Sequence, residues 1–164
     1  MPIKRLTPPA EIDRFIETEI ERLKNALVYN LCAIGEQVVN HARSLPSPSA
    51  AGFIGGMRIP PHQPNYMDWT SNLRSSIGYV VAVDGDVVQL SSFDTVNDGS
   101  EGSKSGKAYA MQLIQDFPKG IVLIVVAGMN YASYVSAKGY DVLDSSELLA
   151  DKLVPQMLGK LGFK

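Results

Sequence analysis

The sequence predicts a single α+β domain over residues 1–164, with a small, mostly antiparallel sheet of three to four strands packed against a long N-terminal helix and a C-terminal helix. Three observations predict this fold class. Apolar residues recur at helical spacing over the first 45 residues, alternation and a tight-turn pair occupy 76–92, and an almost wholly apolar run spans 121–127.

The N-terminal segment carries an apolar side chain at every third or fourth position, at Ile12, Ile16, Ile20, Leu23, Leu27, Leu31, Ile34, Val38, Ala42 and Leu45. This spacing predicts one helix from about 8 to 44, with Thr7 as N-cap and Pro8 at its first position. Such a helix is roughly 55 Å long, whereas a compact domain of this size is about 30 Å across. It must therefore bend onto its own sheet, break near Gly35, or project so that part of its stripe meets another subunit.

Residues 44–65 contain five prolines and three glycines, which predict no regular element. Loops this long are uncommon in compact domains and are usually functional or disordered. We therefore predict a flexible arm at 46–66. It is either a disordered excursion or a docking segment, and the residues that favour docking are Phe53, Ile54, Met57 and Ile59.

The clearest strand pattern follows Trp69. Alternate residues from Ile77 to Val83 are apolar, and Asp84-Gly85 then predicts a hairpin turn, so we expect a hairpin with one face on the long helix. Residues 94–107 are polar and glycine-rich, which predicts a mobile loop. A short helix is expected over 108–117, and the apolar run 121–127 is typical of a central strand buried on both faces. The inward side chains of that helix are predicted to be Met111, Leu113 or Ile114, and Phe117.

The C-terminal part predicts a short edge strand at 140–143 and a final helix over about 145–161. Asp144 and Glu147 have the spacing of a capping box. Pro155 should kink or split this helix.

Composition and motifs indicate no catalytic, cofactor or metal site. The net charge of −2 gives no general attraction to nucleic acid, no apolar run approaches the roughly 20 residues that span a bilayer, and the lone Cys32 forms no intrachain disulfide. The loop before Lys107 departs from a phosphate-binding loop, because Glu101 stands where the first glycine is required. The aromatic residues Trp69, Tyr131 and Tyr134 could form a stacking platform, but buried packing is the expectation.

Two short segments carry a family resemblance. In Asp68–Ile77 the matching residues are Thr70, Leu73, Arg74, Ser76 and Ile77, and in the later segment they are Tyr131, Ala132, Tyr134, Val135 and, with a shift of one, Gly139. The chain resembles the tail-component (tail-completion, or head–tail joining) family of long-tailed bacteriophages and prophages. Members typically show Thr-Gly-x-Leu-Arg-x-Ser-Ile and Tyr-Ala-x-Tyr-Val-Glu-x-Gly segments. Ser71 replaces the usual glycine, which puts a tight backbone position in doubt, and Ser136 replaces the usual glutamate.

The resemblance implies a structural protein without catalysis or cofactor. Copies would assemble as a ring at the tail terminus or head–tail neck, so the expected location is the host cytoplasm during assembly and the virion tail or neck afterwards. The implied partners are further copies and other phage tail or connector proteins, with no small-molecule substrate, nucleic acid or membrane.

Two other functions stay open. One is a small-ligand binding module, with Trp69, Tyr79 and Tyr131 lining a pocket between sheet and helix. The other is a hydrolytic enzyme whose serine or cysteine lies within hydrogen-bond reach of His41 or His62.

Overall fold

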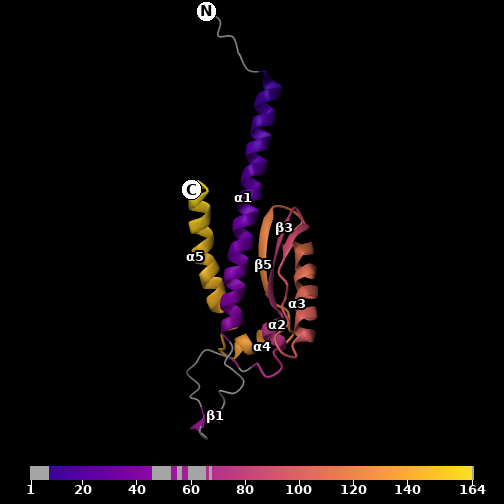
Figure 1. Cartoon of the computed structure of the whole chain (residues 1–164), viewed down its shortest axis with the longest axis vertical. Helices are drawn as coiled ribbons and strands as arrows, with labels where there is room; N and C mark the ends of the chain where they lie inside the picture. Colours follow the sequence, from indigo (N-terminus) through magenta and orange to yellow (C-terminus); the bar gives the residue numbers. More distant parts are fainter. Residues whose placement is uncertain (1–7, 46–52, 55–56, 59–65, 67, 164) are drawn as a thin grey trace, which may run out of the picture.

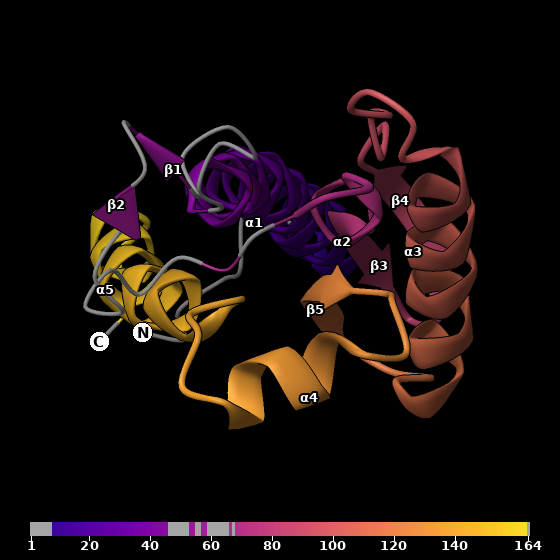
Figure 2. The same cartoon turned by 90° about the horizontal axis from the view of Figure 1, so that it is seen from below.

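The computed structural model describes residues 8–45, 53–54, 57–58, 66 and 68–163. Its centre is an antiparallel sheet of β3 (Ile77–Val83), β4 (Asp86–Leu90) and β5 (Ile121–Ala127) in the order β4-β3-β5. Helix α1 (Pro9–Ser44) covers one face and α3 (Ser100–Leu113) covers the other, while α5 (Asp144–Lys160) lies along α1 (Figures 1 and 2). The predicted α+β fold is confirmed.

The predicted hairpin is formed by β3 and β4. Asp84 and Gly85 both have positive φ, 51° and 87°, as the tightest hairpin turns require. Tyr79 and Val81 face α1 in one cluster, and Val80 and Ala82 face α3 in another. The alternating strand is therefore the one buried on both faces.

The apolar run 121–127 is not the central strand that its composition predicts. β5 pairs with β3 along all seven residues, and the order β4-β3-β5 puts it at an edge of the sheet. The reason is topological, since β4 takes one side of β3 and the chain returns through α3 to the other side.

Helix α1 is continuous from Pro9 to Ser44, close to its predicted bounds, with Pro9 rather than Pro8 in the first helical position. Thr7 lies outside the described residues. The helix does not break at Gly35. This glycine instead makes room for the Tyr79 ring, because a Cβ there would lie 2.6 Å from the ring. Its N-terminal half projects beyond the domain (Figure 1).

The predicted loop at 94–107 is wrong from residue 100 onward, where α3 begins. Its glycines are contact positions rather than loop residues. A Cβ on Gly102 would lie 1.9 Å from the Asn72 carbonyl oxygen, and one on Gly106 would lie 2.3 Å from that of Ser76. A glycine-rich helix therefore packs closer to its neighbours than side chains would allow.

The inner face predicted for the helix at 108–117 is right only at Ile114. A 3₁₀ turn, η2 (Ile114–Asp116), ends α3, and the buried positions are Ala110 and Ile114. Met111 and Phe117, predicted to point inward, are 43% and 44% exposed. The buried face of α3 differs from the predicted one because it is formed by three small residues, Gly102, Gly106 and Ala110, which let the helix pack close to its neighbours.

Two short helices, α2 (Asn72–Ser75) and α4 (Ala132–Ala137), close one end of the molecule (Figure 1). Residues 140–143 form no strand, so that prediction is wrong. The capping box is also not formed, because the Asp141 carboxylate accepts the Ser145 N–H at 3.1 Å instead. Pro155 does not split α5, which is assigned as one helix that packs on α1.

The predicted arm at 46–66 lies mostly outside the described residues. Within it, β1 (Phe53–Ile54) pairs with β2 (Met57–Arg58), so the expectation of no regular element is wrong for this small ladder. Ile59 lies outside the described residues. Tyr66, at the end of the arm, is buried against Leu73.

Candidate functional site

The two segments that carry the family resemblance meet at one end of the molecule. Residues 68–77 form α2 with its flanks, and residues 130–139 form α4 with its flanks. Leu73 shares an apolar cluster with Ala132 and Val135. Thr70 and Tyr131 share a side-chain hydrogen bond. The fold thus joins positions that are distant in sequence.

The remaining motif positions lie elsewhere. Ile77 belongs to the sheet cluster under α1, Ser76 donates to the Leu73 carbonyl at 2.7 Å, and Gly139 turns the chain after α4 with φ 85°. The Arg74 N–H donates to the Asp68 carboxylate at 3.2 Å. Tyr134 is 64% exposed, and the ammonium group of Lys138 lies 5.1 Å from the centre of its ring.

Small polar side chains fix α2 in place. Ser71 has φ 56°, and its hydroxyl accepts from the Asn97 amide at 3.1 Å. The Ser75 hydroxyl accepts the Val96 N–H at 2.9 Å, and Asn72 accepts the Gly102 N–H at 3.0 Å. The left-handed turn at Ser71 is kept although the residue is not glycine. Sequence reasoning missed this network, because its partners come from a segment predicted to be loop.

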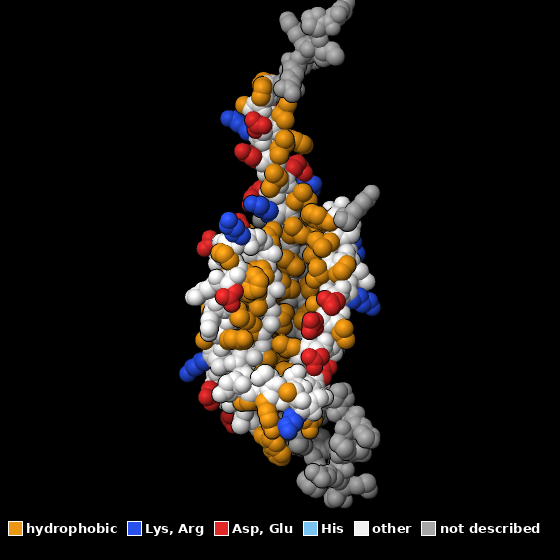
Figure 3. Space-filling view, turned by 180° about the vertical axis from the view of Figure 1, so that it is seen from behind, with side chains coloured by type: hydrophobic (Ala, Val, Ile, Leu, Met, Phe, Trp, Pro, Cys, Tyr) orange, Lys and Arg blue, Asp and Glu red, His pale blue; other side chains and the backbone are white. Residues whose placement is uncertain are grey.

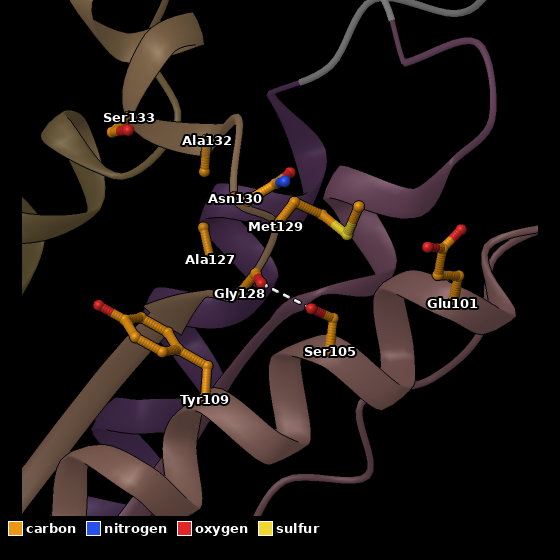
Figure 4. A pocket seen from close by; sticks show the side chains of 9 residues that line it. All are labelled: Glu101, Ser105, Tyr109, Ala127, Gly128, Met129, Asn130, Ala132 and Ser133. Atoms are coloured by element: carbon orange, nitrogen blue, oxygen red, sulfur yellow. Dashed lines mark hydrogen bonds between the residues drawn. The ribbon is translucent and has the colours of Figure 1, made fainter.

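Two hollows flank this end of the molecule. One, of about 480 Å³, lies between α3 and the start of α4, where the Ser105 hydroxyl donates to the Gly128 carbonyl at 2.8 Å (Figure 4). Its side chains include Tyr109 on α3 (Figure 4). The other, of about 520 Å³, lies between α2 and α4. The two hollows share Glu101, Met129 and Asn130.

The predicted aromatic pocket between sheet and helix is not formed. Trp69 and Tyr131 line the α2–α4 hollow, but Tyr79 is 1% exposed in the core under α1. The expectation that Trp69 and Tyr134 are packing residues is also wrong, since they are 74% and 64% exposed. Smaller side chains fill the inner faces of α2 and α4, so the large aromatic groups point outward.

Two tyrosines of this end, Tyr66 and Tyr131, have a raised pKa and are neutral at physiological pH. Burial raises the pKa of Tyr131, the Asp68 carboxylate raises it further, and the hydrogen bond with Thr70 opposes the shift. Burial likewise raises the pKa of Tyr66. Among the described residues, no group of three or more His, Cys, Asp or Glu side chains could hold a metal ion. The arrangement offers aromatic contact and hydrogen bonds rather than an activated nucleophile.

One serine does lie beside a histidine. His41 Nε2 is 2.9 Å from the Ser145 hydroxyl, and the contact ties α1 to the start of α5. This is the geometry that a hydrolytic site would need. Within the described part of the chain, however, no third side chain hydrogen-bonds His41 to orient it. Ser145 and His41 line neither hollow described above.

The projecting half of α1 leaves an apolar face uncovered. Its exposed fractions are 38% for Ile12, 67% for Phe15, 49% for Ile16 and 48% for Ile20. We call these four residues the projecting stripe. Further along α1 the same face is covered by α5 and β5, at Leu27, Leu31, Ile34 and Val38. The projecting stripe is the uncovered continuation of an established helix interface.

Comparison with known proteins adds no relative: no protein-family model, no curated protein and no solved structure matches this chain. None of the helices that the structure describes is long and apolar enough to cross a membrane.

Proposed function

We propose that this chain is a structural protein of a long-tailed bacteriophage or prophage. It assembles with copies of itself at the tail terminus or head–tail neck, acts without catalysis, and ends in the virion. The observation that carries the proposal is the projecting stripe, because a domain that holds four half-exposed apolar side chains on a helix beyond its own core has a surface suited to another subunit.

The energetics support association. Burying what remains exposed of each stripe residue contributes roughly 1 kcal/mol, since full burial of such a side chain contributes about 1.5–3 kcal/mol. Four residues give roughly 4 kcal/mol per contact before the loss of translational and rotational freedom. Such a contact is weak alone and becomes effective when several close a ring.

The α2–α4 end also supports the proposal. The two matched segments pack on each other through Leu73, Ala132 and Val135, and Ser71 adopts the left-handed conformation that glycine favours, at the position where the family pattern has glycine. Both findings are what we expect if this chain has the same backbone conformation at this end as the members of that family.

The test is light-scattering mass against protein concentration, with electron micrographs of any large species. We expect rings or a concentration-dependent increase in mass. The double change Ile16→Glu and Ile20→Glu should abolish it. The matched control, Thr18→Glu with Asn25→Glu, adds the same charge on the opposite face of α1 and should assemble normally. A strict monomer at every concentration, alone and with tail-tube protein, would remove the proposal.

A small-ligand binding module is the second candidate, and the α2–α4 hollow of about 520 Å³ favours it, because Trp69 and Tyr131 both line it. Trp69 is the only tryptophan, so its fluorescence reports on this hollow alone. A saturable change with a panel of small aromatic acids and amines, lost in Tyr131→Ala, would establish this function instead.

A further inference from the structure

One edge of the sheet is unprotected. Exposed edge strands usually carry charges, prolines or bulges that prevent pairing with other chains. β4 follows this rule, with Asp86, a polar Gln89 and a register shift opposite Val81 and Ala82. β5 has seven apolar residues and no charge or proline, and β3 is its sole partner strand in the described sheet.

An apolar groove runs beside this edge. It contains a hollow of about 310 Å³ between α3 and the segment that enters α5, whose polar lining is Ser133, Ser136 and Asp144 and whose apolar lining includes Tyr109, Leu113, Val125, Val126 and Leu143. We call these five apolar residues the β5 groove. Figure 3 shows apolar side chains gathered between α3 and α5 and continuing up the projecting part of α1.

The projecting stripe is short enough to lie along β5, and it matches the β5 groove in chemistry. The stripe runs from Ile12 to Ile20, which is about 13 Å of helix at 1.5 Å per residue, whereas β5, Ile121–Ala127, is about 23 Å long at 3.3 Å per residue. The four stripe side chains are 38–67% exposed and the groove's Tyr109 is 43% exposed, whereas its Val126 is buried, so among the described residues both surfaces offer accessible apolar side chains. They lie at different places on the molecule, so one copy can offer both at once (Figure 3).

We propose that the projecting stripe of one copy docks in the β5 groove of the next copy. The inference rests on the proposed self-assembly and names the surface that receives α1. Covering an edge strand with a helix is one way in which proteins protect such edges. In this arrangement each copy gives its stripe to one neighbour and its groove to another, so the contact is head-to-tail, and each added copy presents a fresh stripe and groove until a ring closes.

Mixing two defective variants tests this contact. The stripe variant is Ile16→Glu with Ile20→Glu, and the groove variant is Tyr109→Glu. Each should be monomeric alone, with association weakened at least about tenfold. Mixed, they should form a dimer of about twice the 17.8 kDa chain mass and nothing larger. The dimer forms because the groove of the first variant still accepts the stripe of the second.

Met111→Glu is the matched control for the groove. Met111 lies on α3 with the same 43% exposure as Tyr109 and lines none of the hollows described above, so this variant should assemble as wild type. Circular dichroism verifies that every variant is folded. If Tyr109→Glu fails to fold, Ile16→Cys mixed with Tyr109→Cys under a mild oxidant, both in a Cys32→Ala background, should give a disulfide-linked heterodimer, whereas Ile16→Cys alone in that background should give none.

The outcomes separate the inference from the proposed function. Suppose that the wild-type chain assembles. The stripe–groove contact is then overturned, and self-assembly still stands, if the mixture stays monomeric, if Tyr109→Glu assembles normally, or if Ile16→Cys crosslinks to itself. A wild-type chain that never associates would overturn both.

Discussion

Gly106 lies on the face of α3 that presses against β3. A methyl group placed there would come within 2.3 Å of the Ser76 carbonyl oxygen and 2.8 Å of two Phe93 ring carbons. Gly106→Ala therefore forces α3 away from the sheet. Overpacking of this kind costs about 1–3 kcal/mol, and the rigid backbone neighbour places it near about 3 kcal/mol. Alanine has a higher helix propensity than glycine by about 1 kcal/mol, so we expect the free energy of unfolding to fall by about 2 kcal/mol.

Gly159 is the matched control, because it also lies in a helix but has nothing within 4 Å of its added Cβ. Gly159→Ala should stabilise the protein by about 1 kcal/mol. Urea unfolding followed by circular dichroism measures both, and the slope with urea should not change. The two variants should thus differ by about 3 kcal/mol. If Gly106→Ala were instead as stable as Gly159→Ala, α3 could not lie against β3 and the loop predicted at 94–107 would be the better description.

Three further results are expected. Tyr79→Phe should lower the free energy of unfolding by about 1 kcal/mol, because Tyr79 donates to the Glu36 carboxylate at 3.0 Å. Tyr66→Phe should be neutral or stabilising by about 1 kcal/mol, because the Tyr66 hydroxyl has no hydrogen-bond partner among the described residues. The opposite order of the two variants in urea unfolding would contradict both assignments. Ser145→Ala should cost about 1 kcal/mol through the lost contact with His41, and a fluorophosphonate should not label Ser145; labelling would identify a nucleophile. Burial raises the pKa of both Tyr66 and Tyr79, so above about pH 10 the unfolded state loses these protons first. The contribution of these two tyrosines to stability should therefore be constant below that pH and fall above it, so the loss of stability above about pH 10 should be less steep in Tyr66→Phe, and an unchanged slope would refute the burial argument.

The candidate site was predictable only in part. The motif residues were found as short strings, but their meeting at one end depends on Leu73 packing against α4. The exposure of Trp69 could not be predicted, because burial depends on which neighbours fill the space beneath a side chain. The lack of charge in 121–127 is compatible with an unprotected edge strand beside the β5 groove. It is equally typical of central strands, which is why the sequence predicts a central strand there.

The sequence alone determined the elements whose signals are local. The helical period set α1 to within a residue of its bounds, and Asp84-Gly85 set the hairpin, because the backbone freedom of a turn and the spacing of a stripe are properties of neighbouring residues. Tertiary structure decided whether residues 100–113 are helix and which strand is central. Those outcomes depend on close backbone approach at Gly102 and Gly106 and on pairing with β3, contacts between residues distant in sequence that no local pattern encodes.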